Sequence, residues 1–242
     1  MIASLGMYDR SEVAHANDAL WGLIRDHLGF GPDRLNRDTP FWESWQSPGL
    51  LFSQTCGLPY RSILHKSVTL VGTPDYGIMG CEPGFYRSVI IARRLSGAEV
   101  TDVSTLRFAF NEQRSQSGWA AFWDHVEGDA PPAEVIETGG HIASAKAVAE
   151  GRADIASIDM HTWKMICTFD DFSHTLEVIS VTSPTPGLPY ITALHDSASA
   201  IQSAVSLAIR DLDQSDRDLI GIRSLVSIPK AQYLAVPLPL TR

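Results

Sequence analysis

The residues best suited to chemistry in this sequence are hydroxyl side chains at two places where a strand is expected to give way to a helix. At the first place, Ser115, Gln116 and Ser117 follow an apolar run at 107–110 and precede Gly118. The first turn of a helix has unpaired amide groups and the positive end of the helix dipole, so hydroxyls there can help to hold an oxyanion. The alternative is that Ser115 and Ser117 only cap the helix.

The second place has the same design, with Thr138 and Gly140 preceding His141 at the start of an expected helix. The dipole at a helix start disfavours the imidazolium ion, so we expect His141 to be neutral and to donate an N–H to an oxygen. A capping or surface histidine is the alternative. Two such segments at adjacent strand ends favour one shared anion site over two separate caps.

Metal and redox chemistry have weaker support. Asp159 and His161 could be paired ligands, but no third ligand stands at a suitable spacing, so we expect neither a metal nor a cofactor. Asp159 is better placed to accept a hydrogen bond from a ligand hydroxyl or to order a neighbour. Cys56, Cys81 and Cys167 are odd in number and irregularly spaced, which predicts free thiols.

Covalent catalysis is disfavoured. Cys56 near His65 could suggest a thiol nucleophile, and Ser117 near His141 could suggest a hydrolase. The sequence has no G-x-S-x-G motif, however, and neither pair has an acidic partner at motif spacing.

Composition indicates a folded protein that is not built to bind nucleic acid. The 242 residues are 44% apolar and 19% charged, which is enough for one large domain or two smaller lobes. The formal net charge is -9, and Lys and Arg form no cluster. The N-terminal residues lack the features of a signal peptide, and no segment approaches 18 uninterrupted apolar residues, so we expect a cytoplasmic chain or a mature exported form.

Strand-like and helix-like stretches alternate along the chain, which favours α/β architecture with crossover helices. The glycines and prolines of residues 72–84 are expected to exclude regular structure, and residues 183–189 are expected to form a rigid bend. The expected strands are residues 2–7, 50–55, 68–71, 86–92, 106–110, 135–138, 154–158 and 176–181, and the expected helices are 12–28, one starting near 60, 118–126, 142–150 and 199–212.

Four segments resemble a known family when they are taken together and in order. They are residues 51–60 (LFSQTCGLPY), 85–90 (FYRSVI), 115–118 (SQSG) and 138–154 (TGGHIASAKAVAEGRAD). With these segments the sequence resembles, over nearly its whole length, the phosphonate-binding-protein-like branch of ABC transporter substrate-binding proteins.

The resemblance implies a type II periplasmic-binding-protein fold. Proteins of that family have two α/β lobes, each with a mixed or parallel sheet flanked by helices, joined by two hinge strands with the ligand in the cleft between the lobes. Here it implies a first lobe at 1–97 and 185–242 and a second lobe at 98–184.

The resemblance also implies a set of ligand contacts in the second lobe. The family's Ser-x-Ser-Gly segment grips phosphonate oxygens, which maps onto Ser115, Gln116 and Ser117. The middle residue is usually Thr, so Gln116 departs from the pattern and leaves the ligand's identity open. The family's histidine after Thr-Gly-Ser maps onto His141, and Gly140 replaces the serine, so one hydroxyl donor is missing.

In the first lobe, aromatic side chains that close over the ligand would correspond to Phe52 and Tyr86, where Phe52 lacks the hydroxyl of a tyrosine. Gln54 and Thr55, in the same matching segment as Phe52, are also expected to contact the ligand. A carboxylate that receives a ligand amine would fall near Asp159.

We therefore expect a non-enzymatic, monomeric protein that closes over a small oxyanion such as a phosphonate, phosphate, phosphite or sulfonate. The resemblance implies delivery of this ligand to an ABC permease in the periplasm or cell envelope. The alternative is an enzyme on the same scaffold that acts on a small organic acid through His141 or Cys56. A ligand sensor is disfavoured, because no helix-turn-helix segment is evident.

Overall fold

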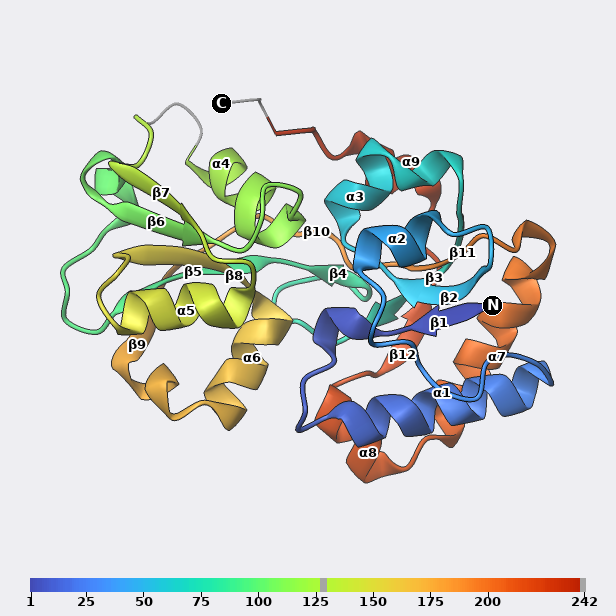
Figure 1. Cartoon of the computed structure of the whole chain (residues 1–242). Helices are drawn as coiled ribbons and strands as arrows, with labels where there is room; N and C mark the ends of the chain where they lie inside the picture. Colours follow the sequence, from blue (N-terminus) through green and yellow to red (C-terminus); the bar gives the residue numbers. More distant parts are fainter. Residues whose placement is uncertain (127–129, 240–242) are drawn as a thin grey trace. The chain divides into compact units, whose positions relative to one another are not determined.

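The computed structural model describes residues 1–126 and 130–239 and has two compact units. Residues 127–129, within the predicted second lobe, and 240–242, at the end of the predicted first lobe, lie outside the described residues. Unit 1 comprises Met1–Phe85 and Pro186–Val236, and unit 2 comprises Tyr86–Thr185 and Pro237–Arg242. Each unit has a mixed sheet with helices packed against it (Figure 1), which confirms the α/β class.

The sheet of unit 1 has the strand order β1-β2-β11-β3-β12. β1 and β2 are parallel, whereas β11 runs antiparallel to both β2 and β3, and β12 runs antiparallel to β3. The strands are β1 (Ile2–Ser4), β2 (Leu50–Gln54), β3 (Thr69–Asp75), β11 (Tyr190–Thr192) and β12 (Ser224–Val226); the helices are α1 (Ala14–Leu28), α2 (Phe41–Gln46), α3 (Gly57–Ser62), α7 (Ala198–Asp211), α8 (Gln214–Ile220) and α9 (Lys230–Ala235).

The expectation that residues 72–84 lack regular structure is wrong at its start, because β3 continues through Gly72 to Asp75. The reason is the neighbouring strand β12, whose Leu225 pairs with Pro74. A side chain on Gly72 would run into the side chain of Leu225, at 2.7 Å from its Cγ. Glycine here lets two strands pack closely, so it supports the sheet instead of ending it.

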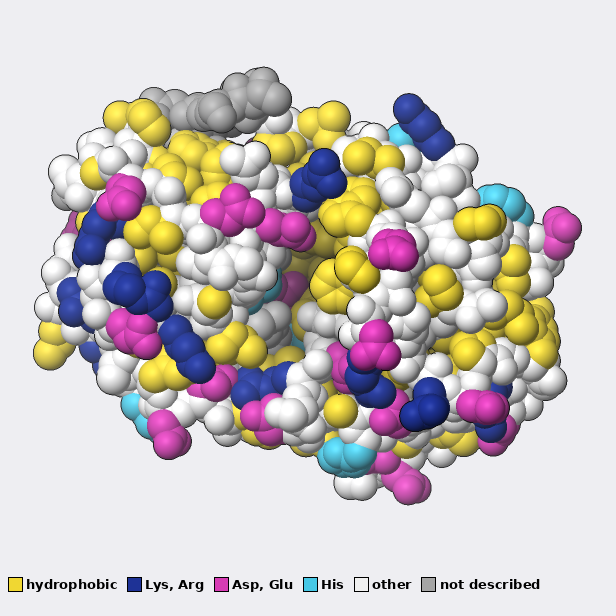
Figure 2. Space-filling view, viewed as in Figure 1, with side chains coloured by type: hydrophobic (Ala, Val, Ile, Leu, Met, Phe, Trp, Pro, Cys, Tyr) yellow, Lys and Arg dark blue, Asp and Glu magenta, His cyan; other side chains and the backbone are white. Residues whose placement is uncertain are grey.

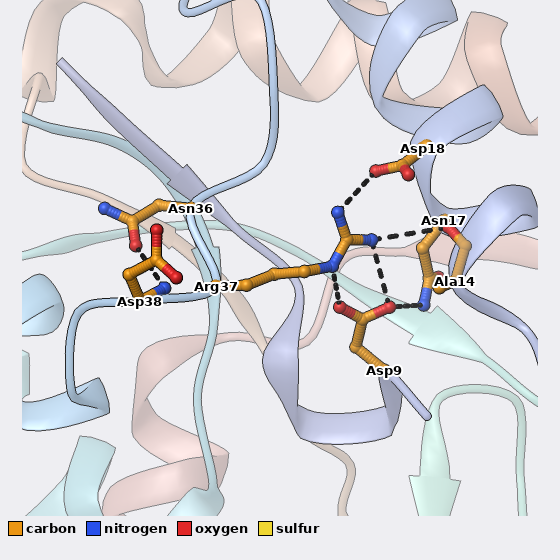
Figure 3. Close-up of polar contacts among 7 residues, drawn as sticks. All are labelled: Asp9, Ala14, Asn17, Asp18, Asn36, Arg37 and Asp38. Atoms are coloured by element: carbon orange, nitrogen blue, oxygen red, sulfur yellow. Dashed lines mark hydrogen bonds and ion pairs between the residues drawn. The ribbon is translucent and has the colours of Figure 1, made fainter. Parts of the chain in front are cut away.

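An ion-pair network fastens the loop after α1 to the start of that helix (Figure 3). The guanidinium of Arg37 donates to Asp9 Oδ2 at 2.6 Å and to Asp18 Oδ1 at 2.8 Å. The hydrogen bonds to Asp9 raise the pKa of Arg37 above its ordinary value. Asn17 also donates to Asp9, at 3.0 Å, so one carboxylate orders both the loop and the first turns of α1.

The sheet of unit 2 has the strand order β7-β6-β8-β5-β9. β6 is parallel to β7 and β8, and β5 is antiparallel to β8 and β9. The strands are β5 (Ser88–Arg93), β6 (Arg107–Phe110), β7 (Glu134–Glu137), β8 (Ile155–Asp159) and β9 (Leu176–Val181); the helices are α4 (Ala121–His125), which continues a π-helical turn at Gln116–Ala120, α5 (His141–Ala149) and α6 (Met160–Phe169).

The two faces of this sheet carry different cores, as alternation along a strand requires. Ala109 faces a core with Ala145 and Val148 of α5. Its neighbours Phe108 and Phe110 face the other way and pack in a core with the side chains of the π-helical turn and α4. β6 is therefore covered on both faces, and the residues that follow it are held in place from both sides.

The chain passes between the units at β4 (Phe85–Tyr86) and β10 (Thr185–Pro186), which pair with each other. The expected boundary at residue 97 lies later in the chain than the observed one at Phe85. The difference arises because β5 pairs with β8 and β9 and so belongs to the sheet of unit 2. The return boundary at Thr185 lies beside the expected one at 184.

Candidate functional site

The first of the two hydroxyl segments forms a compact corner at the end of β6. Ser115 is extended and caps the π-helical turn, because its Oγ accepts a hydrogen bond from Gly118 N at 3.0 Å. Its Oγ also lies 3.4 Å from Ser117 Oγ. Ser115 therefore does cap the helix, as the alternative interpretation predicted. In this capping position its hydroxyl still lies close to the Ser117 hydroxyl.

Two serines from the sheet hold the backbone of this corner. The carbonyl oxygen of Ser117 accepts a hydrogen bond from Ser88 Oγ at 3.0 Å and another from Ser157 Oγ at 2.7 Å. Ser88 and Ser157 lie on the adjacent strands β5 and β8, and all three residues are buried. Two donors on one carbonyl restrict the orientation of the Ser117 peptide, and with it the direction of the Ser117 side chain.

His141 connects the two corners. His141 is the first residue of α5, and its Nε2 atom lies 2.9 Å from Ser117 Oγ. Burial of the ring lowers the pKa of His141 to about 4, and a hydrogen bond with the Ser157 backbone only partly opposes this. The imidazole is thus neutral at pH 7, as its place at a helix start predicted.

Asn111 restricts which residue can occupy the end of the first corner. A side chain on Gly118 would overlap Asn111 Oδ1 and would approach His141 Cε1 to 3.3 Å. The backbone carbonyl of Asn111 accepts from Gly139 N at 2.9 Å, so this residue is bonded to the second corner as well. Gly118 is needed because its neighbours leave no room for a Cβ atom.

The second corner uses its hydroxyl internally. Thr138 Oγ1 lies 3.0 Å from Phe110 O, 3.1 Å from Gly140 O and 2.6 Å from Ser144 Oγ. Thr138 therefore ties the end of β7 to β6 and to α5. Gly140 is extended, and a Cβ atom there would meet nothing within 4 Å.

The sequence matches the family model described as ABC transporter, phosphonate, periplasmic substrate-binding protein over residues 56–231. This chain belongs to that family. It is the family that the resemblance of the sequence implied. No curated protein matches the chain.

Solved structures similar to this substrate-binding protein share its fold at low sequence identity. PhnD1 from Prochlorococcus marinus, in complex with methylphosphonate, has 14% identity and a TM-score of 0.70, covering 96% of this chain and 94% of its own. A binding protein component of an ABC phosphonate transporter from Pseudomonas aeruginosa has 13% identity and a TM-score of 0.70, covering 96% and 82%. A Xanthomonas citri protein bound to ATP has 13% identity and a TM-score of 0.67, covering 96% and 92%.

Three predicted contact residues of this substrate-binding protein lie in unit 1, and two of them have other tasks. Phe52 is fully buried, with its ring between those of Trp21 and Tyr190, so its packing contradicts a ligand wall. Gln54 Nε2 donates to Leu188 O at 3.1 Å and to a tyrosine hydroxyl. Thr55 is fully buried at the end of β2.

The remaining predicted residues lie in unit 2. Asp159 caps α6, because its Oδ1 accepts from His161 N at 2.7 Å and from Thr162 N at 3.0 Å, so it orders the backbone. Gln116 is buried in the π-helical turn, and Tyr86 is buried in β4.

The structure can also be compared with the requirements of a hydrolase, a metal site and a membrane-spanning helix. Ser117 and His141 do meet, as a hydrolase would require, but among the described residues no carboxylate is hydrogen-bonded to His141. In the described part of the chain, no group of three or more His, Cys, Asp or Glu side chains could hold a metal ion. Within the same residues, no helix is long and apolar enough to cross a membrane.

Sequence reasoning missed Asn111, Ser88 and Ser157, three residues that surround the first corner. Ser88 and Ser157 each lie in a mostly apolar strand and are buried, and a buried hydroxyl needs a partner. That pattern could have marked them as serines with a structural bond to make. Their partner, the Ser117 carbonyl, could not have been found, because it depends on the order of strands in the sheet.

Proposed function

We propose that this protein captures a small oxyanion through the cluster of Ser115, Ser117 and His141 in unit 2. The observation that carries the proposal is the gathering of two hydroxyls and one neutral imidazole, with Ser117 Oγ 3.4 Å from Ser115 Oγ and 2.9 Å from His141 Nε2. When the Nε2 proton of His141 is donated to Ser117 Oγ, the hydroxyls of Ser115 and Ser117 can both donate to an anion, and none of the three groups carries a formal charge.

The chemistry of the cluster suits a tetrahedral oxyanion. Hydrogen bonds to a charged group contribute about 1.5 to 3 kcal/mol each, so several of them can supply the roughly 8 kcal/mol that a micromolar dissociation constant requires. The amide of Ser117 lies in the first turn of the π-helical segment, where helix geometry offers it no earlier carbonyl, and so it adds a donor.

The ligand class we infer is the phosphonates and their close analogues. Family membership and the methylphosphonate bound to PhnD1 support this class over sulfonates. Family membership likewise supports delivery of the ligand to an ABC permease on the periplasmic side of a membrane. Thr138 and Asp159 then act as positioning residues, since their side chains are bonded to the backbone around the site.

Calorimetric titration with methylphosphonate, phosphite, phosphate and methanesulfonate tests the proposal. We expect at least one phosphorus oxyanion to bind and Ser117→Ala to weaken that binding about tenfold or more. Ser180→Ala is the matched control, because Ser180 Oγ makes a similar contact with His125 Nε2, at 2.8 Å, elsewhere in unit 2. Binding that is lost equally in both variants, or absent for every oxyanion, would contradict the proposal.

A second candidate function is hydrolysis of a small organic acid ester, because Ser117 Oγ lies within hydrogen-bond reach of His141 Nε2. Turnover of p-nitrophenyl acetate measured beside methylphosphonate binding separates the two functions. His141→Gln and Cys56→Ala should leave the slow background rate unchanged if the protein only binds. Loss of product formation with intact ligand affinity in either variant would favour the enzyme.

A further inference from the structure

Unit 2 contains a partly open cavity of about 530 Å³ that the oxyanion proposal does not use. A cavity of this size is typical of small-molecule sites. Its walls include three aromatic rings, two side chains of the edge strand β7 and one side chain of the loop after β6, namely Phe110, Trp119, Trp123, Val135, Glu137 and Gln113. Figure 2 shows hydrophobic side chains gathered over the α4 and β7 end of this unit, with acidic side chains beside them.

The cavity exists because the helical layer ends before the sheet does. The π-helical turn and α4 cover Phe108 and Phe110 of β6. β7 extends the sheet by one more strand, with Val135 opposite Phe108 and Glu137 opposite Phe110. The side chain of Val135 stays 40% exposed, so the face of β7 beyond α4 is left open.

The aromatic walls meet at steep angles. The rings of Trp119 and Trp123 lie 5.3 Å apart at an interplanar angle of 72°, and Phe110 lies 4.5 Å from Trp119 at 45°. Packing at these angles fixes the three rings relative to one another. The electron-rich faces of aromatic rings attract cations, and indole attracts them most strongly.

The charge at the cavity has the sign that a cation needs. Glu137 is the one ionisable side chain among the described residues that line the cavity. Glu112, nearby, has a raised pKa, first because it is partly buried and second because it feels the charge of Glu137; Arg114 opposes this shift. A bound cation would relieve the repulsion between the two carboxylates, whereas a bound anion would add to it.

From this geometry, we propose that the cavity is a second ligand site of this protein, for a small organic cation of the N-methylated ammonium class. The aromatic rings would contact the methyl groups, and Glu137 would neutralise the charge. The proposal is independent of oxyanion binding, because none of Ser115, Ser117 and His141 lines the cavity.

Choline and its uncharged isostere 3,3-dimethylbutan-1-ol, titrated separately into the full chain, test the proposal by calorimetry and tryptophan fluorescence. We expect choline to bind and the alcohol to bind at least about tenfold more weakly, because only the cation gains from the ring faces and the carboxylate. Equal binding of both compounds would make the cavity an apolar pocket and overturn the proposal. Failure of choline to bind would also overturn it.

Paired variants locate the site. Glu137→Gln should weaken choline binding about three- to tenfold, whereas Glu134→Gln should not change it, because Glu134 is exposed on the opposite face of β7. Trp123→Leu should weaken it about tenfold or more, with thermal unfolding confirming that the variant folds. Ser117→Ala should leave choline binding unchanged. Choline affinity that survives both Glu137→Gln and Trp123→Leu, or that falls with Ser117→Ala, would show that choline binds elsewhere.

Discussion

The two corners of unit 2 share a sequence design but use it differently. At 115–118, the hydroxyls of Ser115 and Ser117 lie 3.4 Å apart, and the Ser117 hydroxyl also contacts His141. At 138–141, the Thr138 hydroxyl is surrounded by two backbone carbonyls and Ser144. The same kinds of residue before a helix therefore form a cluster of neighbouring hydroxyls in one corner, the ligand donors of our proposal, and a structural brace in the other.

The difference follows from what the neighbouring strands leave unpaired. The first corner sits over β5 and β8, whose serines already satisfy the Ser117 carbonyl, so its hydroxyls keep donor capacity. The second corner follows the edge strand β7, where Phe110 O is within reach of the Thr138 hydroxyl. A hydroxyl near a helix start is thus available to a ligand only when no closer backbone acceptor remains.

The largest effect is expected from protonation of His141, the residue that links the corners. It should destabilise the folded protein at acid pH. The pKa of His141 is about 4 in the folded protein and about 6.5 when unfolded, so the unfolded state binds more protons between these values. Stability should fall as the pH drops from 6.5 toward 4, by no more than about 3 kcal/mol, and level off below.

Urea unfolding at pH 7, 5.5 and 4.5 measures the contribution of His141. In His141→Gln the slope over this range should be smaller than in the parent protein, since a group with a lowered pKa has been removed. An unchanged slope would show that other groups cause the acid sensitivity.

The next largest effect is expected from adding a methyl group to each corner, which should change ligand affinity in the first corner only. Gly118→Ala should weaken methylphosphonate binding about ten- to hundredfold, because the new Cβ overlaps Asn111 Oδ1 and the corner must shift. Gly140→Ala should have little effect, since a Cβ there meets nothing within 4 Å and the backbone is extended. Calorimetry of both variants checks the contrast, and similar losses in the two would refute it.

Removing one hydroxyl from each corner should then affect ligand affinity differently. Ser117→Ala should lower ligand affinity about tenfold and should also lower the free energy of unfolding by about 1 kcal/mol, because His141 Nε2 loses its hydroxyl partner. Thr138→Val should lower the free energy of unfolding by about 1 to 2 kcal/mol, because Ser144 and the carbonyls lose a partner, and should affect affinity less. If Thr138→Val weakened binding more than Ser117→Ala, the roles of the corners would be reversed.

The smallest effect is expected from the serines under the first corner. Ser157→Ala removes one of the two donors to the Ser117 carbonyl and should cost about 1 kcal/mol of stability, with a few-fold loss of affinity. Ser157→Thr retains a hydroxyl and should recover part of the affinity. Ser173→Ala, another buried serine of unit 2, is the control and should leave affinity unchanged.

Much of the fold could be predicted from local pattern. The expected helix at 12–28 corresponds to α1, because its apolar residues recur at helical spacing and Gly29 ends it in a left-handed conformation. The elements missed were the helices α2, α6, α8 and α9 and the strands β10, β11 and β12. β11 has only Tyr190–Thr192, and what makes it a strand is its position between β2 and β3, which no local pattern contains.

The candidate site divides in the same way. The contact of Ser117 with His141 followed from two motifs at strand ends. The burial of Phe52 could not be predicted from the sequence, because Trp21 and Tyr190, which pack against its ring, come from distant parts of the chain. Residue types at strand ends indicate where a ligand can bind, whereas the availability of each side chain depends on its neighbours in space.

The paired crossing strands make the main segment of unit 2, Tyr86–Thr185, a contiguous insertion whose two ends lie side by side. Within unit 2, Val89 pairs with Val181 on neighbouring strands, and within unit 1, Gly187 N donates to Gly84 O at 2.8 Å. Residues 86–185 could therefore be excised and expressed alone, and a short turn could rejoin unit 1. Gene fusion or duplication could exchange such a cassette between relatives without cutting through either sheet.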